Sequence, residues 1–183
     1  GYEGMTPEKI INKINDLFPD SIVTTDVGQN QLWTTQYIRM DGKRQFLTSG
    51  GLGTMGYGLP AAIGASIGNP GNPVICISGD GGAQMNIQEL ATAHALETPV
   101  ILCIFNNTYL GNVKQMQKMF YNKRYSSTCL RYSRSCNRQC RIDGTCAGGE
   151  YVPDFVKLAE AMGATGIRGT TREEFTDAFQ KAL

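Results

Sequence analysis

The sequence predicts a three-layer α/β/α fold with a mainly parallel sheet. Residues 74–78 and 100–105 are apolar without alternation, which is typical of strands covered on both faces. These runs alternate with segments whose apolar residues recur at helical spacing. Strands that alternate with helices favour parallel pairing, with helices on both sides of the sheet.

The first elements follow from local signals. Thr6 and Pro7 predict the start of a helix, because a hydroxyl caps its first turn and Pro suits its first position. Pro19 ends this helix. The β-branched residues 22–25 predict a strand that ends at Asp26, and residues 45–48 predict another.

The later elements are read in the same way. The Ala-rich residues 59–67 predict a buried helix, and residues 86–96 predict a second helix between the two apolar strands. After a long irregular stretch, residues 153–162 predict a helix and residues 165–168 a short strand. Thr171 with Glu174 forms a capping box that begins the last helix.

Length, charge and apolar runs narrow the classes of function that this chain can have. The 183 residues fit one domain, and 17 basic against 16 acidic side chains give no argument for nucleic acid or membrane partners. No apolar run approaches the roughly 20 residues of a membrane span. Residues 1–5 lack the pattern of a secretory signal, so we expect a cytoplasmic protein. The internal Met5 indicates a piece of a longer protein or a processed start.

Two strand ends carry residues suited to an anion and a metal ion. In parallel sheets, ligands bind at the carboxyl ends of strands. There the sequence places the turn Gly79-Asp80-Gly81-Gly82 and the pair Asn106-Asn107. Glycines let backbone N–H groups approach an anion closely, and carboxylate and amide oxygens suit Mg²⁺. Either turn alone could be an ordinary strand-to-helix connection.

Together these turns resemble the hallmark of the thiamine-diphosphate enzyme family, Gly-Asp-Gly followed by Asn-Asn. Further segments resemble the C-terminal domain of acetolactate synthase large subunits, namely residues 25–29, 47–56, 59–64, 86–92, 120–121, 124–126 and 153–159. The resemblance covers nearly the whole chain except residues 129–149.

The resemblance implies a set of cofactor-binding residues. Asp80, the side chain of Asn107 and the main-chain carbonyl of Tyr109 would bind Mg²⁺. Gly53 and Met55 would contact the aminopyrimidine ring, and the Met55 side chain would hold the cofactor in its bent conformation. The residues expected at the diphosphate are Gly28, Gln29, Asn30, Gly79, Gly81, Gly82, Leu110 and Gly111.

Four positions depart from the synthase pattern. Asn30 stands where His is expected and Gly82 where Ser is expected, and both changes leave diphosphate binding by backbone N–H groups intact. Asn112 replaces Met and Met116 replaces Trp on the side that the family uses for substrate. These two changes should alter which 2-oxo acid or acceptor fits.

The resemblance also implies a reaction. Enzymes of this type decarboxylate a 2-oxo acid such as pyruvate and transfer the two-carbon unit to a second carbonyl, in branched-chain amino acid biosynthesis. The activating glutamate belongs to a pyrimidine-binding domain of the same or a partner subunit, in a homodimer or homotetramer. Neither that domain nor an FAD-type middle domain matches residues 1–183. We therefore expect no catalytic residue here, an inactive isolated chain, and FAD only with a middle domain.

Three alternatives stay open. Asn112 and Met116 favour another thiamine-diphosphate lyase or a branched-sugar carboligase. A non-catalytic binding module that has lost the cofactor is an alternative from a different class of function. The intact Asp80 and Asn107 argue against it. Residues 51–56 also match the dinucleotide fingerprint, but Pro60 places the helix start beyond these glycines.

The remaining chemistry-bearing residues are cysteines, arginines and one histidine. A Cys-rich loop insertion, residues 129–149, contains four thiols that could hold structural zinc or act independently: Cys129, Cys136, Cys140 and Cys146. Its arginines fit a solvated loop or a domain contact better than nucleic acid binding. Cys76 and Cys103 lie in apolar strands as small hydrophobic residues. We interpret His94 and Glu89 as structural.

Overall fold

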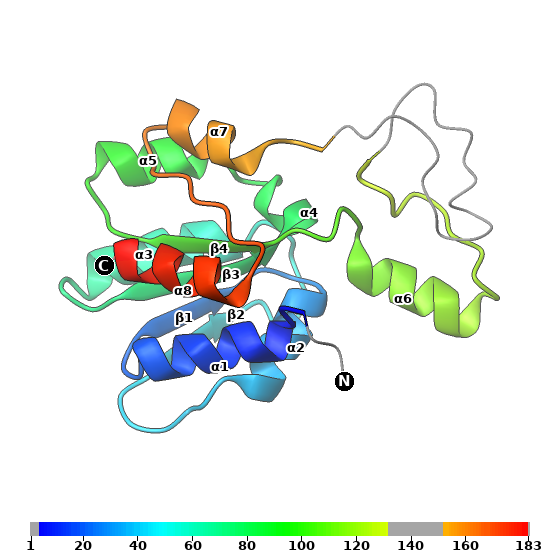
Figure 1. The fold of residues 1–183 in the computed structure, drawn as a ribbon, viewed down its shortest axis with the longest axis horizontal. Coiled ribbons are helices and arrows are strands. Elements are labelled where there is room, and N and C mark those ends of the chain that lie inside the picture. Colours follow the sequence, from blue (N-terminus) through cyan, green and yellow to red (C-terminus); the bar gives the residue numbers. More distant parts are fainter. Residues whose placement is uncertain (1–3, 132–151, 183) are drawn as a thin grey trace.

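The computed structural model describes residues 4–131 and 152–182 (Figure 1). These residues contain one four-stranded sheet, in the order β2-β1-β3-β4, and every pairing is parallel, as predicted. Thr25 at the end of β1 lies opposite Thr48 on one side and Ile77 on the other. The strands are β1 (Ile22–Thr25), β2 (Gln45–Thr48), β3 (Val74–Gly79) and β4 (Ile101–Phe105).

Helices cover both faces of this sheet, so the predicted three layers are confirmed (Figure 1). One face carries α1 (Pro7–Leu17), α2 (Gln29–Tyr37) and α8 (Arg172–Lys181). The other face carries α3 (Gly58–Gly68) and α5 (Glu89–Ala95). The remaining helices are α4 (Asp80–Ala83), α6 (Gly111–Phe120) and α7 (Phe155–Ala161).

Two apolar clusters join the layers. Ile75 and Ile77 of β3 point to the face where Ile11 and Ile14 of α1 and Phe179 of α8 are buried. Val74 and Cys76, which alternate with them, point to α3 on the opposite face. Because burying one such side chain is worth about 1.5–3 kcal/mol, packing on both faces holds β3 firmly in the sheet. This strand leads directly into Asp80.

Capping side chains define several helix ends. Thr6 Oγ1 accepts the N–H of Lys9, 3.4 Å away, at the start of α1. The capping box of Thr171 and Glu174 is present at the start of α8, as predicted. Asp154 Oδ1 accepts the N–H of Val156 at 3.1 Å and begins α7.

Some predicted elements have different limits or are wrong. The helix predicted from residue 86 begins only at Glu89, and residues 84–88 are turns. The strand predicted at residues 165–168 is wrong, because the structure gives residues 165–170 no regular structure. The chain there packs against α7: a Cβ atom on Gly166 would lie 2.6 Å from the carbonyl oxygen of Val156. Gly166 and Gly169 also weaken a strand in so short a segment.

Three helices, α2, α4 and α6, were not predicted. Helix α2 has its polar and apolar residues on no consistent side, and Gly28 before it offers no side-chain cap. Helix α4 is only four residues long. Helix α6 has apolar residues at helical spacing, but it projects away from the sheet (Figure 1).

The strand order brings the polar turns together. The chain leaves β1 toward β2 at one edge, whereas it leaves β3 toward β4 at the other edge. The carboxyl ends of β1 and β3 are therefore neighbours at a topological switch point, where open α/β sheets bind ligands. In the described part of the chain, no helix is long and apolar enough to cross a membrane.

Candidate functional site

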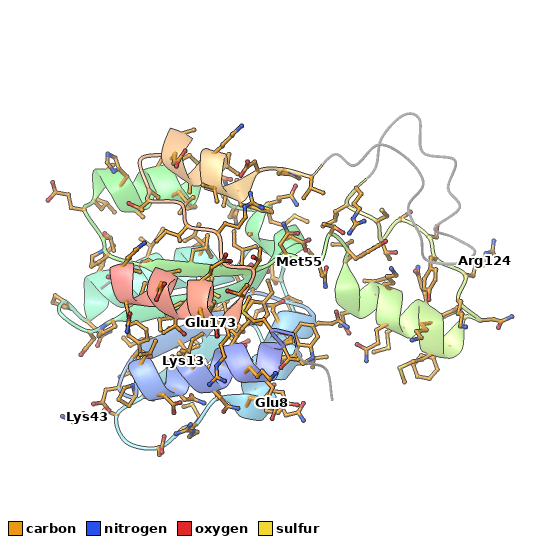
Figure 2. The ribbon with its side chains drawn as sticks, viewed as in Figure 1. Glu8, Lys13, Lys43, Met55, Arg124 and Glu173 are labelled. Carbon is orange, nitrogen blue, oxygen red and sulfur yellow. The ribbon has the colours of Figure 1, made fainter. Side chains whose placement is uncertain are left out.

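A cavity of about 110 Å³ lies at the carboxyl ends of β1, β3 and β4. Of the residues predicted to bind the cofactor, all but Gly53 line it: Gly28, Gln29, Asn30, Met55, Gly79, Asp80, Gly81, Gly82, Asn107, Tyr109, Leu110 and Gly111. Asn112 lines it as well, whereas Met116 does not. In Figure 2, Met55 lies between the sheet and α6. The fold thus brings together residues from four separate strand-to-helix connections and the helix starts that follow them.

Asp80 is the buried acid of this cavity, with 3% of its surface exposed. Its Oδ1 accepts the N–H of Gly81 at 2.9 Å, and its Oδ2 accepts the N–H of Thr108. Burial raises the pKa of this carboxyl, and the backbone N–H groups partly oppose that shift. Each carboxylate oxygen has a further lone pair, so the buried group suits a cation.

The bond from Thr108 to Asp80 fixes the loop that carries Asn107. Thr108 adopts a left-handed conformation with φ 63°, which is uncommon for a β-branched residue. The next main-chain group, the N–H of Tyr109, donates to Asn107 Oδ1 at 2.9 Å. The side-chain oxygens of Asp80 and Asn107 are therefore held by the same turn of backbone.

A short antiparallel bridge holds this loop from its other side. Tyr109 pairs with Cys129, and the Leu110 N–H donates to the Thr128 carbonyl at 2.8 Å. The Leu130 N–H donates to the Thr108 carbonyl at 2.9 Å. Residues 108–110 thus have main-chain partners, which keeps the predicted metal ligands in register with β3.

Neighbouring side chains pack closely against two glycines of the cavity wall. A Cβ atom on Gly81 would lie 2.6 Å from Leu110 Cδ2, and one on Gly111 would lie 2.1 Å from Gln29 Oε1. Gln29 itself donates to Gln115 Oε1 at 2.8 Å and so connects α2 to α6. Bare backbone at both glycines lets a ligand approach the main chain closely.

Asn30 joins two strand ends inside the site. It is 3% exposed, and its Nδ2 donates to the carbonyls of Asp26 at 3.0 Å and Ile77 at 3.1 Å. The amide therefore links the ends of β1 and β3, although it also lines the cavity. Its structural contribution could not be seen from the residue type alone.

Asp26 is a buried acid of the site that was not predicted. Its carboxylate accepts the N–H groups of Val27 at 2.8 Å, Gly56 at 3.0 Å and Gly58 at 3.0 Å. It thereby fastens the loop that carries Met55 to the end of β1. A lone aspartate after a buried strand was the available signal in the sequence.

This arrangement argues against the dinucleotide alternative. In that fingerprint the glycine-rich loop offers its N–H groups to a pyrophosphate. Here the N–H of Gly56 is taken by the carboxylate of Asp26, and α3 begins only at Gly58.

The donor set fits Mg²⁺ and a diphosphate. A carboxylate, an amide oxygen and main-chain groups are hard oxygen ligands, and Mg²⁺ completes its shell with water and phosphate oxygens. Within residues 4–131 and 152–182, no group of three or more His, Cys, Asp and Glu side chains could hold a metal ion. The proposed magnesium ligands are of a different kind, with one acid, one amide and one carbonyl.

The other candidate residues lie apart from the cavity. Burial raises the pKa of Cys76 and of Cys103 to about 12, so both thiols stay protonated at neutral pH. His94 is exposed on α5 beside Gly163, and Glu89 Oε2 accepts the Thr92 hydroxyl at 2.7 Å. Of the four clustered cysteines, Cys129 is half-buried, and Cys136, Cys140 and Cys146 lie outside the described residues.

Comparison with known proteins agrees with this geometry. Residues 26–183 match the family described as "Thiamine pyrophosphate enzyme, C-terminal TPP binding domain". The chain is 43% identical to a probable acetolactate synthase large subunit of Methanococcus aeolicus, across 97% of this chain and 27% of that protein. It is 42% identical to an acetolactate synthase of Mycobacterium bovis, across 97% and 26%. The chain thus spans about a quarter of the length of these relatives.

Proposed function

This chain belongs to the thiamine pyrophosphate (thiamine diphosphate) enzyme family, whose C-terminal cofactor-binding domain it represents, and on that premise we propose its function. It supplies the diphosphate and Mg²⁺ half of the active site of an acetolactate synthase-type carboligase. The observation that carries this proposal is the convergence of Asp80 and Asn107 on one glycine-lined cavity. The synthases named above support the reaction class.

Three groups would hold the metal ion. They are the carboxylate of Asp80, the side-chain oxygen of Asn107 and the main-chain carbonyl of Tyr109. Bonds to Thr108 and Gly81 orient the Asp80 carboxylate before any ligand arrives, so little order is lost on binding.

The diphosphate would lie against the start of α6 and the glycines of the cavity. The first N–H groups of a helix have no partner within it, and they favour an anion. Gly111 and Asn112 begin α6 at the cavity wall. Opposite them, Met55 reaches over Gly81, since a Cβ atom on Gly81 would lie 3.6 Å from Met55 Cε.

When bound, the cofactor supplies the electron sink for decarboxylation of a 2-oxo acid and transfer of its two-carbon unit. The residues of this chain anchor the charged end of that cofactor and set its direction. The Met55 side chain supports the ring end, on a loop that Asp26 holds in place.

The site needs a second domain. A cavity of about 110 Å³ is smaller than the roughly 300–1,000 Å³ that enclose a whole cofactor-sized ligand. We therefore assign the aminopyrimidine end and its activating glutamate to a pyrimidine-binding domain of the same or a partner subunit. The isolated chain would then be inactive.

Helix α6 offers a surface for that domain. Apolar side chains on it and just after it are exposed to solvent, by 61% for Met119, 67% for Phe120 and 66% for Tyr121. Leu52, three residues before Met55, is 97% exposed. Because a large exposed apolar area marks an interaction surface, we propose that the full protein is a homodimer or homotetramer across this face.

Further assignments depend on the rest of the protein. FAD would bind only if the full-length protein has a middle domain, and we place the enzyme in the cytoplasm with its metabolic substrates. Zinc bound by the cysteines of residues 129–149 is a separate proposal, since three of these four cysteines lie outside the described residues. Metal analysis of protein purified without added zinc tests it: less than about a tenth of an equivalent would exclude it.

Calorimetric titration tests the proposed function. Thiamine diphosphate should bind the 183-residue chain in the presence of Mg²⁺ and at least tenfold more weakly without it. Asp80→Ala should abolish the Mg²⁺-dependent part, since it removes the only acidic ligand proposed. Asp177→Ala, an exposed acid on α8, should bind like the native chain.

Two results of this titration would contradict the proposal. Binding that is independent of Mg²⁺, or that survives Asp80→Ala, would remove the metal assignment. If the native chain does not bind even after the pyrimidine-binding domain is added, the cofactor assignment itself is wrong.

A further inference from the structure

Arg131 contacts the loop that carries two of the proposed metal ligands. Its Nε donates to Thr108 Oγ1 at 2.5 Å, and its guanidinium carbon lies over the ring of Tyr109, 5.8 Å from the ring centre. Arg131 lies within residues 129–149, where the resemblance to acetolactate synthases is interrupted. That resemblance therefore assigns Arg131 no role, and its role must be inferred from its contacts.

Thr108 connects the three proposed ligands. It lies between Asn107 and Tyr109 in the chain, and its N–H donates to Oδ2 of Asp80. A change in the backbone angles of Thr108 would turn the peptide groups on both sides of it. The side chain of Asn107 and the carbonyl of Tyr109 would then move relative to the Asp80 carboxylate. The convergence of the three ligands therefore depends on the conformation of Thr108.

That conformation is unfavourable for a threonine by itself. Thr108 has φ 63°, in the left-handed region, where the Cβ atom of an L-residue crowds the following carbonyl oxygen. A residue keeps such a conformation only when its surroundings hold it there. Thr108 is 8% exposed, and its carbonyl accepts the N–H of Leu130 at 2.9 Å. The main chain thus supplies part of the restraint.

The side chain of Thr108 supplies the rest through two hydrogen bonds. Its hydroxyl donates to the Asn107 carbonyl at 2.6 Å and accepts from Arg131 Nε. A hydroxyl group has one proton, so it can make this pair of bonds at the same time. A charged donor makes the stronger kind of hydrogen bond, and it polarises the hydroxyl toward the next acceptor. Arg131 thus holds the Thr108 hydroxyl against the peptide group that follows Asn107.

We propose that Arg131 is a positioning residue of the cofactor site, which acts through the Thr108 hydroxyl to keep the Mg²⁺ ligands Asp80, Asn107 and Tyr109 in register. This inference rests on the proposed function, because it concerns the metal ion of that same site. A guanidinium group could also act in a second way, by attracting the diphosphate through its charge. The two ways differ in whether the effect requires Mg²⁺ and the Thr108 hydroxyl.

The test measures the affinity of the full-length protein for Mg²⁺ by calorimetry, at a fixed concentration of thiamine diphosphate. Arg131→Ala removes the donor, and Lys118→Ala removes an exposed positive charge of α6 as a control. Arg131→Ala is then combined with Thr108→Ser, which keeps the hydroxyl, and with Thr108→Gly. Glycine lacks the hydroxyl and adopts a positive φ freely. A separate titration measures the binding of thiamine diphosphate without Mg²⁺.

Arg131→Ala should weaken Mg²⁺ binding by about tenfold, the factor expected for one hydrogen bond from a charged donor. The same loss should appear when the change is made in Thr108→Ser. In Thr108→Gly, Arg131→Ala should change Mg²⁺ binding by less than about twofold, because the pathway through the hydroxyl is already absent. Binding of thiamine diphosphate without Mg²⁺ should stay at its native value, which also shows that the variant is folded. Lys118→Ala should leave both affinities unchanged.

Three results would overturn the inference while the proposed function stands. Native Mg²⁺ affinity in Arg131→Ala would remove the role of Arg131. Equal losses with and without Mg²⁺ would mean that the guanidinium attracts the diphosphate by charge. A tenfold loss that persists in Thr108→Gly would mean that Arg131 does not act through the hydroxyl. If the native protein shows no Mg²⁺-dependent binding of thiamine diphosphate, the proposed function fails and this inference fails with it.

Discussion

The end of the sheet at β1 and β3 and the helix α6 differ in how they are held. The carboxylate of Asp26, 1% exposed, accepts three main-chain N–H groups and lies among buried strands. None of the ten residues of α6, all of them described, is buried. Yet both regions contribute walls to the same cavity.

The difference separates the wall of the site that this chain holds in place by itself from the wall that lacks packing within this chain. The polar groups of the loops after β1 and β3 have hydrogen-bond partners within the chain, so no ligand is needed to hold these loops in place. Helix α6 is attached through its first turn, through Gln115 to Gln29 and through Gln117 to Ser126. Its apolar side chains are at most partly buried here, and helices of this length owe most of their stability to packing.

The largest expected loss of stability comes from a change at the end of the sheet, beside β1 and β3. A Cβ atom on Gly58 would lie 2.8 Å from the main-chain nitrogen of Asp26 and 3.0 Å from Cys76 Sγ. Gly58→Ala should therefore lower the free energy of unfolding by about 3 kcal/mol, as measured by urea denaturation. Gly64→Ala on the same helix meets nothing within 4 Å and should be neutral or stabilise by up to about 1 kcal/mol. Equal effects of the two changes would mean that the sheet end accommodates an added methyl group as readily as the open side of α3 does.

Changes on α6 should have a smaller effect on the unfolding free energy, and their main effect should be on subunit association. The double change Met119→Ser and Phe120→Ser should alter the unfolding free energy of this chain by less than about 0.5 kcal/mol, because both side chains are exposed. In the full-length protein it should weaken subunit association by at least tenfold, measured by sedimentation over a range of concentrations. A loss of stability in the isolated chain without weaker association would show that α6 serves the fold and not a partner.

The smallest effect concerns α8, far from the site. Hydrogen bonds from Thr170 and Thr171 lower the pKa of Glu174 below its ordinary value of 4.5. The charged form is thus favoured by folding, so its stabilisation is present above pH 4.5 and is lost as the pH falls through the lowered value. Glu174→Gln should be slightly less stable than the native chain at neutral pH and equal to it at strongly acidic pH. Thermal melts at the two pH values measure this, and a difference that persists in acid would contradict it.

The sequence was sufficient for the parts of the fold that an apolar pattern controls. The runs that became β1 and β3 are β-branched or continuously apolar and are buried, and α3 is apolar on most sides, so burial explains these elements. The run that became β4 is equally apolar but only half-buried, at the edge of the described sheet. The residues expected to bind the cofactor were identified by resemblance, and all of them but Gly53 line one cavity.

What could not be predicted depends on contacts between distant residues. Asp26 reaches a loop 30 residues further along, and nothing near it in the sequence marks Gly56 and Gly58 as its partners. The strand predicted at residues 165–168 does not form, because Gly166 packs against Val156 of α7. Helix α2 lacks a periodic apolar side, so its position is set by Gly28 and by the buried Asn30.

The core cluster around β3 is completed only after the residues of the cavity have been synthesised. Every residue that lines the cavity lies between Val27 and Val113, so a ribosome completes them before it makes α8. Phe175 and Phe179, which cover Ile75 and Ile77 on the strand that leads to Asp80, are synthesised some sixty residues later, at a typical 5–20 residues per second. For several seconds the nascent chain would therefore hold the residues expected to bind the ligand on a strand that α1 and α2 already cover but that still lacks the cover of α8. During that interval α8 is the missing part, and a chaperone or the cofactor itself would have its strongest influence on folding.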